Sequence, residues 1–170
     1  MPVLQPRSMD GKMPRYILPV LAALSLFAAS PAVYADGTGM SDLLQSAGDN
    51  TYRDAVKAVE AKQYRTAIDL LDKVIEKKPN NPDALNYLGF SHRKLGEYGI
   101  AVTYYKRALA LEPSHRGANE YLGEAYVELG NIPAAEERLT ALAKICGTDC
   151  DEYRDLKAAI DAGRAKAKQG

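Results

Sequence analysis

Residues Pro82–Pro113 read PDALNYLGFSHRKLGEYGIAVTYYKRALALEP, and this stretch matches the chain again when it is moved by 34 residues in either direction. The matching positions are Leu88-Gly89 with Leu122-Gly123, Ala101 with Ala135 and Ala67, and Pro113 with Pro79. A fixed period of this length is typical of a helix–turn–helix solenoid. The repeat therefore predicts an all-α fold.

The period divides the chain of 170 residues into three successive units, 48–81, 82–115 and 116–149. Before them, 36–47 is rich in Gly, Ser and Asp and is expected to form a flexible leader. After them, 150–170 is expected to form a capping helix and a tail. Such a cap would cover the exposed side of the last repeat and keep the solenoid soluble.

The second unit shows the expected helix pair most clearly. Its first helix, helix A, should run over about Pro82–Leu95, with Asn81 as the N-cap and Gly96 just after the last residue. Its second helix, helix B, should run over about Tyr98–Leu111 and end before a proline.

The cap is expected to be a seventh helix over about Cys150–Lys166. Asp149 with Glu152 three residues later has the pattern of a capping box. We therefore expect the Asp149 side chain to begin this helix.

The units resemble the tetratricopeptide repeat, whose signature is W-x2-L-G-x2-Y, then A-x3-F, then P. The second unit supplies Leu85-x2-Leu88-Gly89-x2-His92, Ala101-x3-Tyr105 and Pro113. The resemblance implies a right-handed helical solenoid of three helix–turn–helix repeats with a C-terminal capping helix. The first unit keeps only the second half of the signature, as expected of a terminal repeat.

In proteins of this family the A helices line a concave groove that holds a peptide or a helix of another protein. The matching positions here, carried over from the family, are Tyr52, Val56, Asn86, Phe90, Arg93, Lys94, Glu120 and Glu124. This groove would change from apolar to basic to acidic along the repeats. The alternative for each residue is plain solvent-exposed surface, and the aromatic pair Tyr52 and Phe90 is the most informative, since exposed aromatic residues often anchor interfaces.

One subclass of the family does not fit. Domains that clamp the C-terminal carboxylates of cytosolic chaperones use Lys, Asn and Arg at five fixed positions. Here those positions hold Tyr52, Val56, Tyr87, Gly117 and Tyr121. The sequence therefore predicts a different partner.

The first 35 residues have the pattern of a secretory signal peptide. Basic residues precede the apolar run Tyr16–Ala29, which is too short to cross a bilayer, and small residues precede a cleavage point after Ala35. The translation start would be Met1, Met9 or Met13. We expect export to the periplasm of a bacterium without stable membrane insertion; an uncleaved anchor is the alternative.

Few residues could carry chemistry. In an oxidising compartment Cys146 and Cys150 would form a structural disulfide; free or intermolecular thiols, a catalytic pair and a metal site are the alternatives. His92 is expected to pack between helices and His115 to be solvated. The sequence predicts no enzyme, no metal and no cofactor.

The balance of 22 acidic and 22 basic residues gives no field that favours nucleic acid. The sequence therefore predicts a protein-interaction module, an adaptor or assembly factor that binds a protein or peptide of unknown identity. A thiol-disulfide factor that uses the cysteine pair is the second hypothesis. Self-association, with the groove binding a neighbour's leader, is the third.

Overall fold

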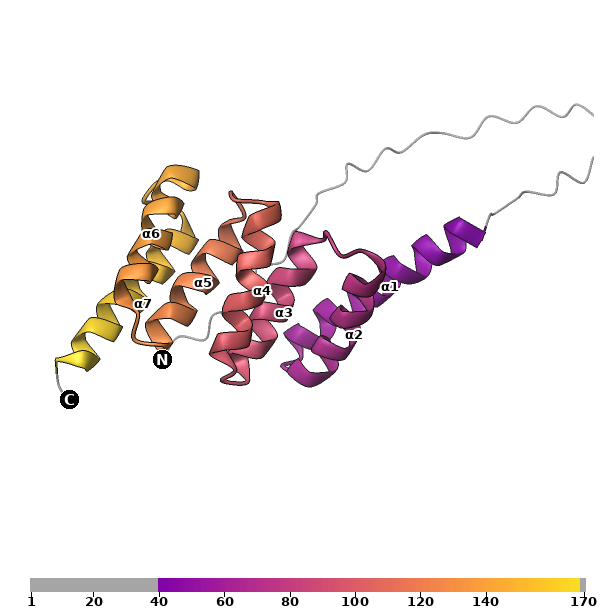
Figure 1. Ribbon diagram of the computed structural model, residues 1–170, viewed down its shortest axis with the longest axis horizontal. Helices are drawn as coiled ribbons and strands as arrows, with labels where there is room; N and C mark the ends of the chain where they lie inside the picture. Colours follow the sequence, from indigo (N-terminus) through magenta and orange to yellow (C-terminus); the bar gives the residue numbers. More distant parts are fainter. Residues whose placement is uncertain (1–39, 169–170) are drawn as a thin grey trace, which may run out of the picture. The chain divides into compact units, whose positions relative to one another are not determined.

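The computed structural model describes residues 40–168 of the chain (Figure 1). The predicted signal peptide, 1–35, and residues 36–39 of the predicted leader lie outside this part. The described residues form seven helices and no strand: α1 Met40–Glu60, α2 Tyr64–Lys77, α3 Pro82–Lys94, α4 Tyr98–Leu111, α5 Arg116–Glu128, α6 Ile132–Cys146 and α7 Asp151–Ala167. The predicted all-α class is confirmed.

The helices pair as the repeat requires. Each A helix, α1, α3 or α5, packs against its own B helix, α2, α4 or α6, and each B helix also contacts the next A helix. The last helix, α7, packs on α5 and α6, and Figure 1 shows the helices stacked in a row. Ala67, Ala101 and Ala135 are fully buried at equivalent positions of the three B helices. The arrangement is the predicted tetratricopeptide-repeat solenoid.

The central helices begin and end close to the predicted residues. The side chain of Asn81 accepts a hydrogen bond from the backbone N–H of Ala84 at 3.0 Å, as expected of an N-cap. Helix α4 has the predicted bounds, and α3 ends one residue earlier than predicted. Local signals therefore suffice to place these helix ends.

Each turn from an A helix to its B helix contains one residue with a left-handed backbone. In the second and third repeats this residue is Gly96 (φ 80°) or Gly130 (φ 73°), but in the first repeat it is Lys62 (φ 60°). The turn around Lys62 is closed by a hydrogen bond from the N–H of Gln63 to the carbonyl of Ala58, and the other two turns have the equivalent bond. A side chain at such a position strains the backbone, so the first repeat departs from the local preference here.

Two predictions are wrong, one about the start of α7 and one about the exposure of His115. The α7 helix begins without the expected capping box: its N-cap is Cys150, no side chain caps it, and Asp149 lies outside the helix.

His115 is not solvated, since its side chain is 12% exposed and accepts a hydrogen bond from the N–H of Ala118. Its Nε2 lies 3.1 Å from Asp83 Oδ1, which holds the pKa of that carboxyl below its usual value. His115 therefore caps α5 and ties it to α3.

The N-terminal part of the described chain also differs from the expectation. Residues 40–47 belong to α1, whereas the sequence predicts a flexible leader over 36–47. The segment contains no proline or β-branched residue to oppose helix, so the first A helix extends toward the N-terminus.

No helix among the described residues is long and apolar enough to cross a membrane.

We predict that Lys62→Gly stabilises the fold by about 1 kcal/mol, because glycine adopts the left-handed backbone of this turn without strain. The reciprocal change, Gly96→Lys, should destabilise it by a similar amount. Urea unfolding followed by circular dichroism measures both changes. Equal stability of the wild-type chain and Lys62→Gly would contradict the interpretation of this turn.

Candidate functional site

The predicted partner residues all lie on the A helices, and we call them the A-helix face: Tyr52, Val56, Asn86, Phe90, Arg93, Lys94, Glu120 and Glu124. Few of them are open surface. Asn86 and Glu120 are buried, with 8% and 6% exposure, and Lys94 is exposed. The face is therefore formed largely by partly buried side chains in contact with one another.

Phe90 is at the centre of this face. Its ring lies 5.2 Å from that of Tyr121 and 6.2 Å from that of Tyr64. The guanidinium of Arg93 lies over both Phe90 and Tyr121, at 5.6 and 5.3 Å from the ring centroids, and the amino group of Lys94 lies 5.1 Å from the Phe90 centroid. Phe90 is thus an anchored, half-buried aromatic residue and not a free surface ring.

The first repeat contributes a second aromatic contact. Tyr52 and Tyr87 pack edge to face at 6.2 Å, and both rings contact the core of the first repeat. Burial raises the pKa of both phenols. These rings occupy positions that the carboxylate-clamp subclass fills with polar side chains, so the geometry of that clamp is absent from the described residues.

Arg93 forms a largely buried ion pair with Glu124, at 2.7 Å between Nη2 and Oε2. The two side chains are 11% and 13% exposed. The sequence predicts a basic region followed by an acidic one, but the structure pairs the two charges with each other. Ions removed from water in this way are costly unless they are paired, so the pair fixes α3 against α5.

Glu120 has the most perturbed environment of the predicted site residues. Burial, together with the nearby carboxylates of Glu124, Asp155 and Glu152, raises its pKa to about 9, whereas Arg93 opposes the shift. Glu120 is therefore mostly protonated at neutral pH. Sequence reasoning placed this residue on the groove but did not predict its burial.

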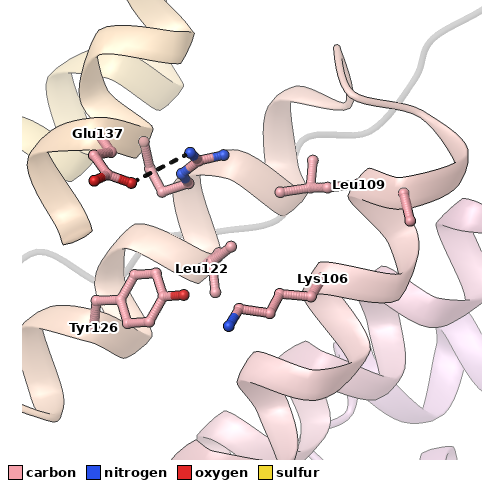
Figure 2. A pocket seen from close by; sticks show the side chains of 7 residues that line it. Lys106, Leu109, Leu122, Tyr126 and Glu137 are labelled. Carbon is pink, nitrogen blue, oxygen red and sulfur yellow. Dashed lines mark ion pairs between the residues drawn. The ribbon is translucent and has the colours of Figure 1, made fainter.

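The described residues also form an opening of about 420 Å³ between α4, α5 and α6 (Figure 2). It is lined by Lys106, Leu109, Ala110, Leu122, Tyr126, Glu137 and Arg138. Figure 2 shows the Lys106 amino group and the Tyr126 hydroxyl pointing toward the same opening. None of these residues belongs to the A-helix face, and sequence reasoning did not find this site, because its residues carry no shared motif.

The two cysteines lie where α6 ends and α7 begins, and the structure joins them as a disulfide with 5.9 Å between their Cα atoms. Glu152 is close to both sulfurs. Sulfurs joined to each other do not supply the thiolates that a zinc site needs. The arrangement serves as a cross-link between the last repeat and its cap.

Comparison with known proteins agrees with this fold. Residues 60–142 match the family described as "Anaphase-promoting complex, cyclosome, subunit 3". The chain is 31% identical over 81 residues to small glutamine-rich tetratricopeptide repeat-containing protein 2 of Mycosarcoma maydis. The match covers 48% of this chain but only 23% of that relative, so the chain spans about a quarter of the relative's length.

Solved structures show the same fold at low identity. The first TPR of Spaghetti (RPAP3), bound to the HSP90 peptide SRMEEVD, has a TM-score of 0.63 and 19% identity, covering 69% of this chain and 93% of that one. The chaperone SycD of Yersinia enterocolitica, in complex with a peptide of the translocator YopD, has a TM-score of 0.61 and 15% identity, covering 76% and 97%. Together with the repeats, these matches show that the chain has the tetratricopeptide-repeat fold.

We predict that the unfolding free energy of the wild-type chain falls between pH 5 and pH 9 partly because of Glu120. The folded state keeps a proton on this carboxyl up to about pH 9, whereas the unfolded chain releases it near its ordinary value of 4.5, so rising pH favours unfolding in this range. The slope from this one proton is at most about 1.4 kcal/mol per pH unit.

Glu120→Gln should remove the contribution of Glu120 to the fall of unfolding free energy with pH, as measured by urea unfolding at pH 5, 7 and 9. Glu137→Gln, which changes an exposed carboxyl of α6, should leave the slope unchanged. Identical slopes in the wild-type chain and Glu120→Gln would show that the fold does not raise the pKa of Glu120.

Proposed function

We propose that this chain is an exported, non-enzymatic adaptor or assembly factor of the bacterial periplasm or cell envelope, which binds a peptide or a helix of a partner protein on its A-helix face. The observation that carries the proposal is the Phe90 cluster, in which one aromatic ring is held between two tyrosines under two cationic side chains. A surface that is already ordered loses little conformational entropy when it binds.

The similar proteins support an interaction role. The RPAP3 domain is bound to an HSP90 peptide, and SycD is bound to a peptide of YopD. Both have the fold of this chain, but their low identity gives no information about its partner. The clamp positions differ, so the partner of this chain should be recognised by other contacts.

We predict that Lys94→Glu weakens capture of the partner, because it reverses the charge of the exposed cation at the centre of the face. Lys106→Glu is the matched control, since Lys106 is also exposed but lies on a B helix. Pull-down from envelope extract with each variant as bait, analysed by mass spectrometry, compares the two. A protein retained by Lys106→Glu and lost with Lys94→Glu is the expected result; equal capture by both variants would place the binding surface elsewhere.

Phe90→Ala should also weaken capture, but it removes contacts with Tyr64 and Tyr121 and will therefore lower stability. Tyr104→Ala is its control: this residue stacks on His92 and is not part of the A-helix face. Capture is compared at a temperature at which both variants remain folded by circular dichroism.

Export rests on the basic and apolar pattern of the first 35 residues, which precedes the described part. Fractionation of cells that express the full chain tests it. A mature protein that begins at Asp36 in the periplasmic fraction is expected, and an unprocessed protein in the cytoplasm would contradict the proposal.

The alternative function is that of a periplasmic thiol-disulfide factor. It is favoured by the position of Cys150 at the start of α7, because a helix N-terminus stabilises a thiolate. The reduction potential of the Cys146–Cys150 bond separates the two functions, since a structural disulfide lies below about −300 mV.

A further inference from the structure

The third A helix and the cap bring four carboxyl groups together. They are Glu120 and Glu124 of α5, and Glu152 and Asp155 of α7. Two of these groups have cationic partners: Arg93 pairs with Glu124, and Arg116 lies 3.6 Å from Glu152. Within residues 50–168, neither Glu120 nor Asp155 forms a hydrogen bond or an ion pair through its carboxyl group. The cluster therefore has more negative groups than cations to balance them.

A second, independent observation comes from the neighbouring helix. Asn86 is 8% exposed, and its Oδ1 has no hydrogen-bond partner in the described part of the chain. Asn86 occupies the same repeat position on α3 as Glu120 does on α5, and its amide packs against Gly117, one turn before Glu120. A buried carbonyl oxygen without a donor costs about 1–3 kcal/mol, which indicates that a donor belongs at this place.

The other buried polar atoms without partners include both donors and acceptors. Among the described side chains they are Glu152 Oε2, Arg93 Nε and the Tyr105 hydroxyl, which interacts electrostatically with Arg93. Around the acidic cluster two of these unpaired atoms are acceptors, Asn86 Oδ1 and Glu152 Oε2, and one is a donor, Arg93 Nε, on the residue that pairs with Glu124. The two acceptors lack a donor, and the excess of carboxyl groups over cations favours a donor that carries positive charge.

We propose that Asn86, Glu120, Glu152 and Asp155, which we call the acidic end of the A-helix face, bind the ammonium or guanidinium of a lysine or arginine side chain from the partner peptide. This inference rests on the proposed function and specifies the chemistry of its partner. The carboxylates balance the charge of the incoming cation, and Asn86 Oδ1 accepts one of its hydrogen bonds.

A basic side chain fits this place better than a free cation. The half-buried ring of Tyr121, the residue after Glu120, already holds the guanidinium of Arg93 at 5.3 Å, which shows that the aromatic groups of this face accommodate a basic side chain. The unpaired Arg93 Nε can donate to a backbone carbonyl of the same peptide. The acidic end thus has groups that can bind both the basic side chain and a backbone carbonyl of a peptide.

Binding should be coupled to a proton. Glu120 is protonated when the peptide is absent and ionises when the cation arrives, so the carboxyl proton passes to the buffer. The facing groups are Glu124 on the same helix, Arg93 on α3, and Glu152 and Asp155 on α7. Affinity for a basic peptide should therefore rise between pH 6 and pH 9.

The test uses the chain that begins at Asp36 and three fluorescein-labelled peptides, GSLALKLALSG and its versions with norleucine or glutamate in place of the single lysine. Fluorescence anisotropy should show that the lysine peptide binds about tenfold or more tightly than the norleucine peptide, as expected for a hydrogen-bonded charge, and that the glutamate peptide binds most weakly. Glu120→Gln should remove the preference for lysine and its rise with pH. The control Glu137→Gln should retain both.

Three results would overturn the inference: equal affinities for the lysine and norleucine peptides, a preference that survives in Glu120→Gln, or no binding of any peptide at 1 mM. None of these results decides whether the A-helix face binds a partner, so the proposed function is tested separately. If extract capture is lost in Lys94→Glu but kept in Glu120→Gln, the A-helix face binds a partner but the acidic end does not recognise its charge.

The basic segment that precedes the apolar run is the competing occupant within this chain, through Arg7, Lys12 and Arg15. The full chain should bind the lysine peptide as tightly as the chain that begins at Asp36. Weaker binding by the full chain, restored when these three residues are changed to Gln, would assign the acidic end to the chain's own segment and contradict the inference of an external partner.

Discussion

Close contact at the glycines of the A helices sets the geometry of this molecule. A Cβ atom at Gly89 would lie 2.6 Å from the ring of Tyr105, and one at Gly123 would lie 2.5 Å from Leu156. The missing side chain lets an aromatic or leucine side chain of the neighbouring helix occupy the space above the backbone. Helices α3 and α5 are thereby each held against a neighbouring helix in one rotation, and that rotation decides which of their side chains form the A-helix face.

That close packing also explains why the face is less exposed than a list of its residues suggests. Two contacts that form it, Phe90 with Tyr121 and Arg93 with Glu124, join residues 31 apart on successive A helices. Each of these two α3 side chains therefore packs against α5 one helical turn before the residue that occupies the same position in the next repeat. The face is ordered before any partner arrives, and the charges of Arg93 and Glu124 balance each other.

The sequence predicts the fold well because the decisive signals are local. The N-cap Asn81 and the bounds of α4 follow from residues within one helical turn of each helix end. Contacts across helices were not predictable in the same way. The contact of His115 with Asp83, the ion pair of Arg93 and the burial of Glu120 depend on distances between helices, which the period alone does not supply. The 31-residue spacing that joins Arg93 to Glu124 becomes visible only once the helices are placed.

The cap has a larger role than closing the solenoid. Helix α7 takes the place on α5 that a further A helix would occupy, and Leu156 and Ile160 fill the core there. A cap needs a polar outer surface. Glu152 and Asp155 of α7 are instead half-buried and act on the buried Glu120, whose pKa they raise. Uncharged polar side chains at these two positions of α7 would keep the solenoid equally soluble, but they would not make Glu120 harder to ionise. The placement of these carboxyls therefore makes the cap part of the A-helix face, and it gives the C-terminal end of that face a charge character that the first two repeats lack.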